Sequence, residues 1–329
     1  MPPSQQSTKP ATSFDVARRA GVSRSTVSNI LNGNDARFPQ ATRERVLKAA
    51  DELDYRPSLA GRSLVSGRSD TVVVLLPNTT FGSNLQDAVD EAVASTTRFG
   101  GNVVVRFAGE SPKATINAIA ALRPLAVLAF SDLPDDDRER LEAAGTMVLG
   151  ARASTVGSSF DGGIARLQAN ALLERGPRPL WFASLSDNRQ DPYGPPRFAA
   201  LQRFCESEAL PPPAQIEVPL NVEEATRALA QVMERTAVAG VVCYNDDVAM
   251  ALLAAAREMG ITVPQELSVV GVDNTAVGQL WAPRLTTVDT DLRGLVAGYS
   301  AELEARLAGS AERIEPPPHH FTVIRGETT

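Results

Sequence analysis

A row of polar side chains between positions 24 and 29 is the part of this chain best suited to chemistry with another molecule. Within the sequence RSTVSN, an arginine, three hydroxyls and an amide point outward from one helical segment: Arg24, Ser25, Thr26, Ser28 and Asn29. Such groups donate and accept hydrogen bonds, and they are the side chains that meet phosphates and the edges of bases. The row therefore predicts recognition of a nucleic acid.

Residues 12–32 must position that row, and their pattern predicts two short helices around a tight turn at residues 20–23. Apolar residues recur at helical spacing on both sides of the turn, at Phe14, Val16, Ala17 and Ala20 and again at Val27, Ile30 and Leu31. Gly21 can take a positive φ, and Ser23 can accept from the N–H groups that open the second helix. This is the pattern of a helix-turn-helix, which places its second helix in a major groove. The alternative is a helical hairpin that merely has a polar face.

A third helix and a short linker complete the N-terminal part. Residues 41–53 carry Val46, Leu47, Ala50 and Leu53 on one predicted face, which closes the small core. The segment LAGRSL then follows Pro57, and with Gly61 inside it is too short to be a stable helix by itself. We expect a disordered arm at 1–11, a helix-turn-helix domain at 12–57 and a hinge at 58–68, which orders only against a partner.

Charge is segregated along the 329 residues. The whole chain has a formal net charge of −7, yet residues 1–69 contain eleven Lys or Arg and six Asp or Glu. The first part is therefore basic and the remainder acidic, which favours DNA binding by the first part alone. The expected phosphate-facing surface consists of the basic residues at 18, 19, 24, 43, 45 and 48.

From residue 69 onward the pattern is that of an α/β domain. Short apolar runs at 72–76, 102–107, 126–130 and 146–150 alternate with helical stretches, and a second set follows at 179–183, 215–218, 240–244 and 267–272. Such alternation predicts parallel sheets wrapped by helices in two lobes. The strands at 286–289 and 321–324 return the chain between lobes. We expect lobe 1 at about 70–160 and 290–318, and lobe 2 at about 161–288 and 319–329, with a cleft between strand ends.

Several classes of protein are disfavoured by the composition. Cys205 and Cys243 are the only cysteines, which fits buried thiols in a reducing cytosol. No apolar run approaches the roughly 18 residues of a membrane helix, so a cytoplasmic protein without a membrane partner is expected. The two histidines, His319 and His320, have no other metal-ligand residues near them, and no phosphate loop or nucleophile elbow is visible. We therefore expect no enzyme activity, no metal and no cofactor.

Longer motifs match one family across nearly the whole chain. DVARRAGVSRSTVSNILNG and TRERVLKAADELDYRPS lie in the first part, and YNDDVAMALLAAAREMGITVPQELSVVGVDN and PRLTTVD in the second. With these motifs the chain resembles the LacI/GalR family of bacterial transcription regulators. The resemblance implies a helix-turn-helix head, a two-lobed periplasmic-binding-protein-like domain of type I, a homodimer on a palindromic DNA operator, and a small-molecule effector such as a sugar. No leucine-heptad tail follows Ile324, so a dimer is expected rather than a tetramer.

The resemblance also assigns roles to individual residues. The family's base-reading positions correspond to Arg24, Ser25 and Asn29, although Asn29 stands where arginine is usual. Its phosphate contacts correspond to Ser23, Thr26 and Ser28. The family's hinge leucine, which enters the minor groove, corresponds to Leu64, an apolar residue in an otherwise polar linker.

The effector positions of the family correspond to Arg197, Asn245 and Asp273, with Asp161 as a weaker match. The residues agree in part, since Arg197 begins a predicted helix and Asp273 ends a predicted strand. Asp246 is expected to cap the next helix, which leaves Asn245 for the ligand. Departures occur at Gly176-Pro177, at residues 78–81 and at Val222, which replaces an aromatic residue.

Three alternatives share some of these features. A repressor fused to a sugar-kinase fold would need ATP-binding glycine motifs and a cysteine cluster, which the sequence lacks. A periplasmic binding protein would need a signal peptide and would have no DNA-binding head. A regulator of the same fold whose effector pocket is degenerate, and which answers to a protein partner or to no ligand, stays open.

Overall fold

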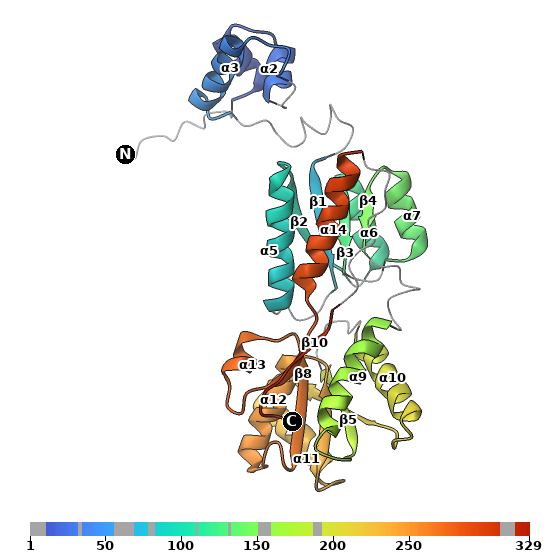
Figure 1. Cartoon of the computed structure of the whole chain (residues 1–329). Coiled ribbons are helices and arrows are strands. Elements are labelled where there is room, and N and C mark those ends of the chain that lie inside the picture. Colours follow the sequence, from blue (N-terminus) through green and yellow to red (C-terminus); the bar gives the residue numbers. More distant parts are fainter. Residues whose placement is uncertain are drawn as a thin grey trace, which may run out of the picture. The chain divides into compact units, whose positions relative to one another are not determined.

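The computed structural model describes nine stretches of the chain. These are residues 11–31, 35–55, 69–77, 83–109, 111–130, 133–150, 159–186, 193–309 and 320–329. Contacts between residues divide the chain into two compact units, Met1–Asp70 and Thr71–Thr329. The described part of the first unit contains three helices, and the second unit contains two sheets with their helices. Figure 1 shows the helices that lie against the sheets.

The first unit is a small three-helix core. Its helices are α1 (Ser13–Ala20), α2 (Arg24–Leu31) and α3 (Gln40–Glu52). The buried apolar side chains come from all three helices and are Val16, Ala17, Ala20, Val27, Ile30, Val46, Ala49 and Ala50. The helix-turn-helix predicted from the sequence is thus the observed local structure, with Gly21 at φ +66° in the turn.

Two apolar residues that we expected in this core lie outside it. Phe14 is 59% exposed and Leu47 is 54% exposed. Phe14 precedes Val16 by two residues, and Leu47 follows Val46 directly, so each lies about 100° or more around its helix from the buried face. Helical spacing alone did not separate these positions from the core because a three-helix unit buries only a narrow face.

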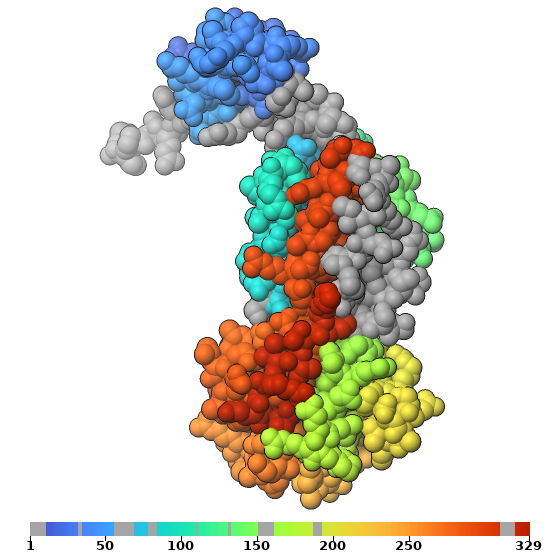
Figure 2. Space-filling model, in the orientation of Figure 1, coloured from blue at the N-terminus to red at the C-terminus, as the bar shows by residue number. Residues whose placement is uncertain are grey.

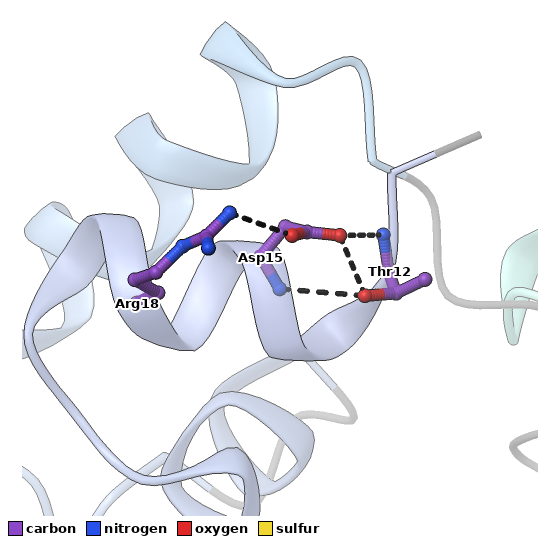
Figure 3. A network of polar contacts seen from close by, with 3 residues as sticks. All are labelled: Thr12, Asp15 and Arg18. Atoms are coloured by element: carbon purple, nitrogen blue, oxygen red, sulfur yellow. Dashed lines mark hydrogen bonds and ion pairs between the residues drawn. The ribbon is translucent and has the colours of Figure 1, made fainter. Parts of the chain in front are cut away.

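A polar network fixes the start of α1. The Thr12 hydroxyl accepts from the Asp15 amide, and the Asp15 carboxylate accepts from the amide and hydroxyl of Thr12, which completes a capping box (Figure 3). Arg18 donates to the second oxygen of Asp15 at 3.0 Å. Two backbone N–H groups at the helix end are thereby satisfied, and a negative charge lies where the helix dipole favours it.

The first lobe of the second unit is a parallel sheet in the order β2-β1-β3-β4. Its strands are β1 (Thr71–Leu76), β2 (Asn102–Phe107), β3 (Ala126–Ala129) and β4 (Met147–Leu149). One face packs against α5 (Ser83–Arg98) and α14 (Leu292–Leu307), and the other against α6 (Pro112–Leu122) and α7 (Asp135–Ala143). The surfaces of α5 and α14 lie side by side in Figure 2.

The second lobe is built on a sheet in the order β10-β9-β8-β7-β5-β6. Its strands are β5 (Leu180–Ser186), β6 (Ala214–Pro219), β7 (Ala239–Cys243), β8 (Leu267–Val272), β9 (Thr286–Asp289) and β10 (Thr322–Ile324). Its helices are α9 (Ser159–Leu173), α10 (Gly194–Ser207), α11 (Val222–Met233), α12 (Asp246–Met259) and α13 (Ala276–Leu280). The buried faces of α9, α10, α11 and α12 pack against this sheet.

The end of the chain joins the two lobes. After β9 the chain contributes α14 to the first lobe, and β10 then pairs with β9 in the second. Every other pairing between the described strands is parallel, as we expected from the sequence, and β10 runs antiparallel to β9. Pairing is antiparallel because the chain enters β10 from the opposite end of the sheet. None of the described helices combines the length and apolar character that crossing a membrane requires.

Candidate nucleic-acid interface and candidate ligand site

The hydroxyls at the start of α2 form a connected group. The Ser23 Oγ lies 2.7 Å from Ser25 Oγ and 2.9 Å from Thr26 Oγ1, and it accepts from the Thr26 backbone amide at 3.1 Å. Ser23 thus caps the helix as expected. Ser23, Arg24 and Ser25 are exposed, whereas Thr26 and Ser28 are half-buried. The exposed end of α2 therefore presents hydroxyls and a guanidinium to solvent.

Asn29 lies one turn further along α2 and is half-buried. Its Nδ2 donates to the Ser25 carbonyl at 2.7 Å. An amide nitrogen carries two hydrogens, so one remains to donate while Oδ1 accepts. Adenine is recognised by one donated and one accepted hydrogen bond, and the observed Asn29 contact leaves both available.

The basic residues expected to face phosphates separate into two groups. Arg18 pairs with Asp15, Arg19 with Glu52 and Arg43 with Asp35, at 3.0, 2.6 and 3.3 Å. Exposed ion pairs of this kind contribute little stability and exchange readily. Within the described part of the first unit, Arg24, Arg45 and Lys48 have no ion pair. These three side chains are the least committed to contacts inside the unit.

Arg197 is the centre of the candidate ligand site. It lies near the start of α10, is buried, and its Nε is 3.6 Å from the Asp161 carboxylate of α9. Its Nη1 donates to the Tyr244 carbonyl at 2.6 Å. Its guanidinium also lies over the rings of Tyr193 and Tyr244, with 5.1 and 5.4 Å to the ring centroids. The site thus holds a buried charge whose Nε has no hydrogen bond.

Asp273 follows β8 directly and is half-buried, as the sequence pattern predicted. Its backbone adopts φ +106°, a conformation that costs energy in a residue other than glycine. The Nδ2 of Asn84, at the start of α5 in the first lobe, lies 3.5 Å from its Oδ1 and 3.3 Å from the Thr290 hydroxyl. Desolvation raises the pKa of Asp273 to about 7, although the nearby charge of Arg197 acts in the opposite direction.

The residue that caps α12 is Asn245, where we expected Asp246. Asn245 is the N-cap of α12 and its Oδ1 accepts from the Val248 amide at 3.0 Å. The residue before a helix has the extended backbone that directs its side chain to the free N–H groups, and the first helical residue does not. The side chain that caps α12 is therefore the one we assigned to the ligand.

Asp246 is instead fully buried and bonded to Thr275, beyond β8, and to Thr287 of β9. Its carboxylate accepts from the Thr275 amide at 2.7 Å, from the Thr275 hydroxyl at 2.9 Å and from the Thr287 hydroxyl at 2.6 Å. Burial raises its pKa to about 6, against these hydrogen bonds. Gly271 leaves the room that this carboxylate needs, because a Cβ there would lie 2.1 Å from Oδ1.

Some residues of this site had no signal in the sequence. Asn84 lies far from Asp273 in the chain and only the fold brings the two together, whereas Tyr193 precedes Arg197 by four residues at the start of α10. Val222, the departure from the family's aromatic residue, begins α11 and is exposed. Leu64 and residues 78–81 lie outside the described residues.

Both cysteines are buried and free, and desolvation raises the pKa of each thiol. Protonated buried thiols are poor nucleophiles and poor metal ligands. Across the described stretches, no three His, Cys, Asp or Glu side chains are grouped as a metal ion would require.

Comparison with known proteins identifies both units. Residues 14–58 match the model of bacterial regulatory proteins of the lacI family, and residues 169–329 match a periplasmic binding protein-like domain. Among curated relatives, the HTH-type transcriptional repressor PurR of Vibrio atlanticus is 32% identical over 297 residues, covering 84% of this chain and 86% of the relative. PurR of Vibrio parahaemolyticus is also 32% identical, with the same coverage of both chains.

Solved structures share the fold. A lac repressor dimer bound to operator and the anti-inducer ONPF gives a TM-score of 0.77 at 24% identity, covering 97% of this chain and 99% of that chain. A LacI family protein from Silicibacter pomeroyi gives 0.79 at 22% identity, with coverage of 97% and 99%. With its helix-turn-helix, its two-lobed domain and its relationship to the PurR repressors, the chain belongs to the LacI family of DNA-binding transcription regulators.

Proposed function

We propose that this protein is a cytoplasmic repressor that binds a palindromic operator as a homodimer and whose operator affinity is set by a small-molecule effector. The observation that carries the regulatory part is the polar cluster around Arg197. There a buried guanidinium, two carboxylates and an amide from the other lobe lie together. A ligand bound among them would contact both lobes at once.

DNA recognition is assigned to the exposed end of α2. Arg24, Ser25 and Asn29 are proposed to read bases, and Ser23, Thr26 and Ser28 to contact phosphates. The connected hydroxyls and the uncommitted Arg24 support these roles. Leu64 is proposed to enter the minor groove between two half-sites, as hinge side chains of architectural proteins do.

Effector recognition is assigned to Asp161, Arg197 and Asp273, and no longer to Asn245, because its side chain caps α12. A ligand with hydroxyl or carbonyl groups would accept from Arg197 and donate to Asp273. Closure of the lobes around that ligand alters the spacing of the two DNA-binding heads in the dimer. Linkage then requires that DNA change effector affinity by the same factor.

Selection of DNA from a random pool, repeated with a panel of sugars, nucleobases and related metabolites, tests this function. We expect one palindromic sequence to be enriched and one class of metabolite to change the enrichment. Arg197→Ala and Asp273→Ala should bind the selected operator yet lose the response to that metabolite. Arg227→Ala, which removes an exposed guanidinium from α11, is the matched control and should retain it.

A regulator with a degenerate site is the second candidate. The observation in its favour is that Arg197 is already engaged by Asp161, the Tyr244 carbonyl and two tyrosine rings. Val222 also offers no aromatic ring for stacking. If the site is degenerate, the same operator is enriched to the same degree with every metabolite. The operator affinity of Arg197→Ala then responds to none of them, as is also the case for the parent protein.

A further inference from the structure

Tyr193 contacts both Arg197 and the first lobe. Its ring lies over the Arg197 guanidinium at 5.1 Å, within the second lobe. Its hydroxyl donates to the Phe130 carbonyl at 3.0 Å, at the end of β3 in the first lobe. A single side chain thus has one contact on each side of the interlobe boundary.

Phe130, the residue that Tyr193 contacts in the first lobe, packs against the core of that lobe. The Phe130 amide donates to the Leu75 carbonyl of β1, which fixes the backbone to which Tyr193 is bonded. The Phe130 ring meets Tyr299 of α14 edge-on, with the centroids 6.3 Å apart, and Tyr299 is buried in the lobe core. A shift of the Phe130 carbonyl therefore requires a shift of the strand end or of α14.

The Tyr193 hydroxyl is suited to donate a hydrogen bond at every working pH. Desolvation raises the pKa of its hydroxyl well above the usual value for tyrosine. The hydroxyl consequently keeps its proton at any pH at which the protein works. The carbonyl of Phe130 can only accept, so the bond has one polarity and does not depend on pH.

We propose that Tyr193 is a latch that joins Arg197 to the first lobe, so that the first lobe senses through this side chain a ligand that engages Arg197. This rests on the proposed function only for its regulatory consequence. The guanidinium face occupied by the Tyr193 ring is a face that a ligand ring or sugar would otherwise cover. A ligand that takes this face must move the ring, and the ring carries the hydroxyl away from Phe130.

Two variants separate the two contacts. Tyr193→Phe keeps the ring over Arg197 and removes the bond to Phe130. Tyr193→Ala removes both contacts. Tyr55→Phe makes the same chemical change as the first variant but in the DNA-binding unit, and it is the matched control.

Hydrogen exchange of the full-length protein without DNA or ligand tests the bond between the lobes. Tyr193→Phe should speed exchange about fivefold in peptides that contain Phe130 and Asn84, because one net hydrogen bond is worth about that factor. Peptides from β7 and α12 should not change. Unaltered exchange around Phe130 in both Tyr193 variants would overturn the latch.

Modification by phenylglyoxal, an arginine reagent, tests the ring contact in the same ligand-free protein. The peptide carrying Arg197 should be protected in the parent protein and in Tyr193→Phe, and modified at least fivefold faster in Tyr193→Ala. Equal rates in the two variants would show that the ring does not cover Arg197. Since neither measurement contains DNA or a metabolite, failure of the latch is distinguishable from failure of the operator selection.

Discussion

At the scale of single residues, Asn29 decides whether α2 reads sequence or only follows the phosphate backbone. Its Nδ2 is bonded to the Ser25 carbonyl, which fixes the amide plane before DNA arrives. A side chain fixed in this way loses less conformational entropy when it binds. Asn29 is therefore better prepared to contact a base edge than a mobile arginine would be.

Asn29→Ala should weaken binding to the selected operator by about 1–3 kcal/mol and relax the preference at one position in each half-site. Fluorescence anisotropy with the operator and with single-base variants measures both effects. Lys48→Ala, which removes a charge from α3, should weaken binding to all these sequences alike. If Asn29→Ala also weakens binding to all these sequences alike, Asn29 contacts a phosphate and not a base edge.

Asp273 gives the protein a pH dependence of stability. Its pKa is about 7 in the folded protein against an ordinary value of 3.8, so the folded state binds this proton more tightly than the unfolded chain does. Through this residue, the free energy of unfolding decreases as the pH rises from about 4 to about 7, and the penalty is constant above that range. The ligand site thus includes a carboxylate that is costly to ionise.

Asp273→Asn should relieve this cost. We expect the melting temperature of the variant, relative to the parent protein, to increase across pH 4 to 7 and then to level off, as followed by scanning fluorimetry at closely spaced pH values. Asp136→Asn, on the exposed side of α7, controls for the loss of one carboxylate. A difference that stays constant with pH would mean that Asp273 does not titrate in this range.

At the scale of elements, the capping box of α1 positions the first helix of the DNA-binding unit. The unit is small and buries few large side chains, so a single cap is a sizeable part of its stability. Thr12→Ala should lower the free energy of unfolding of this unit by about 1 kcal/mol. Ser13→Ala, one residue later, removes a hydroxyl without a hydrogen bond to the described residues and should have little effect.

Thermal unfolding followed by hydrogen exchange in α1 and α2 peptides checks this prediction, because the two units can unfold separately. Exchange in peptides of the second unit serves as the internal reference. Equal destabilisation by the Thr12 and Ser13 variants would show that the cap is not what stabilises α1.

The elements themselves follow from local patterns, whereas their contacts do not. Apolar runs such as residues 72–76 predicted β1 because buried parallel strands are apolar on both faces. Gly21 predicted the turn because few other residues adopt a positive φ. Which of Asn245 and Asp246 caps α12 depends on the backbone angles of one residue. The sequence does not indicate these angles, because the two residues are adjacent and both are polar.

Contacts between segments far apart in the sequence could not be predicted, for a different reason. The bond from Tyr193 to Phe130 joins residues 63 positions apart, and nothing in either neighbourhood indicates the other. The position of Arg197 over the Tyr244 ring likewise depends on how α10 packs on the second sheet. Family resemblance supplied Arg197 and Asp273, but their partners come from the fold.

At the scale of the whole molecule, the edge of the first sheet is the surface best suited to the proposed dimer. β2 is the edge strand, and its Val104 and Val105 are each 37% exposed. An apolar edge strand that stays uncovered promotes aggregation, so natural proteins cover or charge such edges. The sequence NVVVRF has a single charge, at Arg106, which favours a covered edge.

We predict that a second copy of the chain covers β2, and that Val105→Lys weakens the dimer about tenfold or more, since it places an unpaired charge in the covered edge of each copy. Sedimentation equilibrium measures the dimer constant directly. Val238→Lys places the same change at an equally exposed valine, before β7 in the second lobe, and should leave the dimer intact. If operator binding requires the proposed dimer, Val105→Lys should also weaken operator binding at low protein concentration and spare it at high concentration. An unchanged dimer constant in Val105→Lys would show that the dimer interface does not include β2. A monomeric parent protein would contradict the proposal of a dimer.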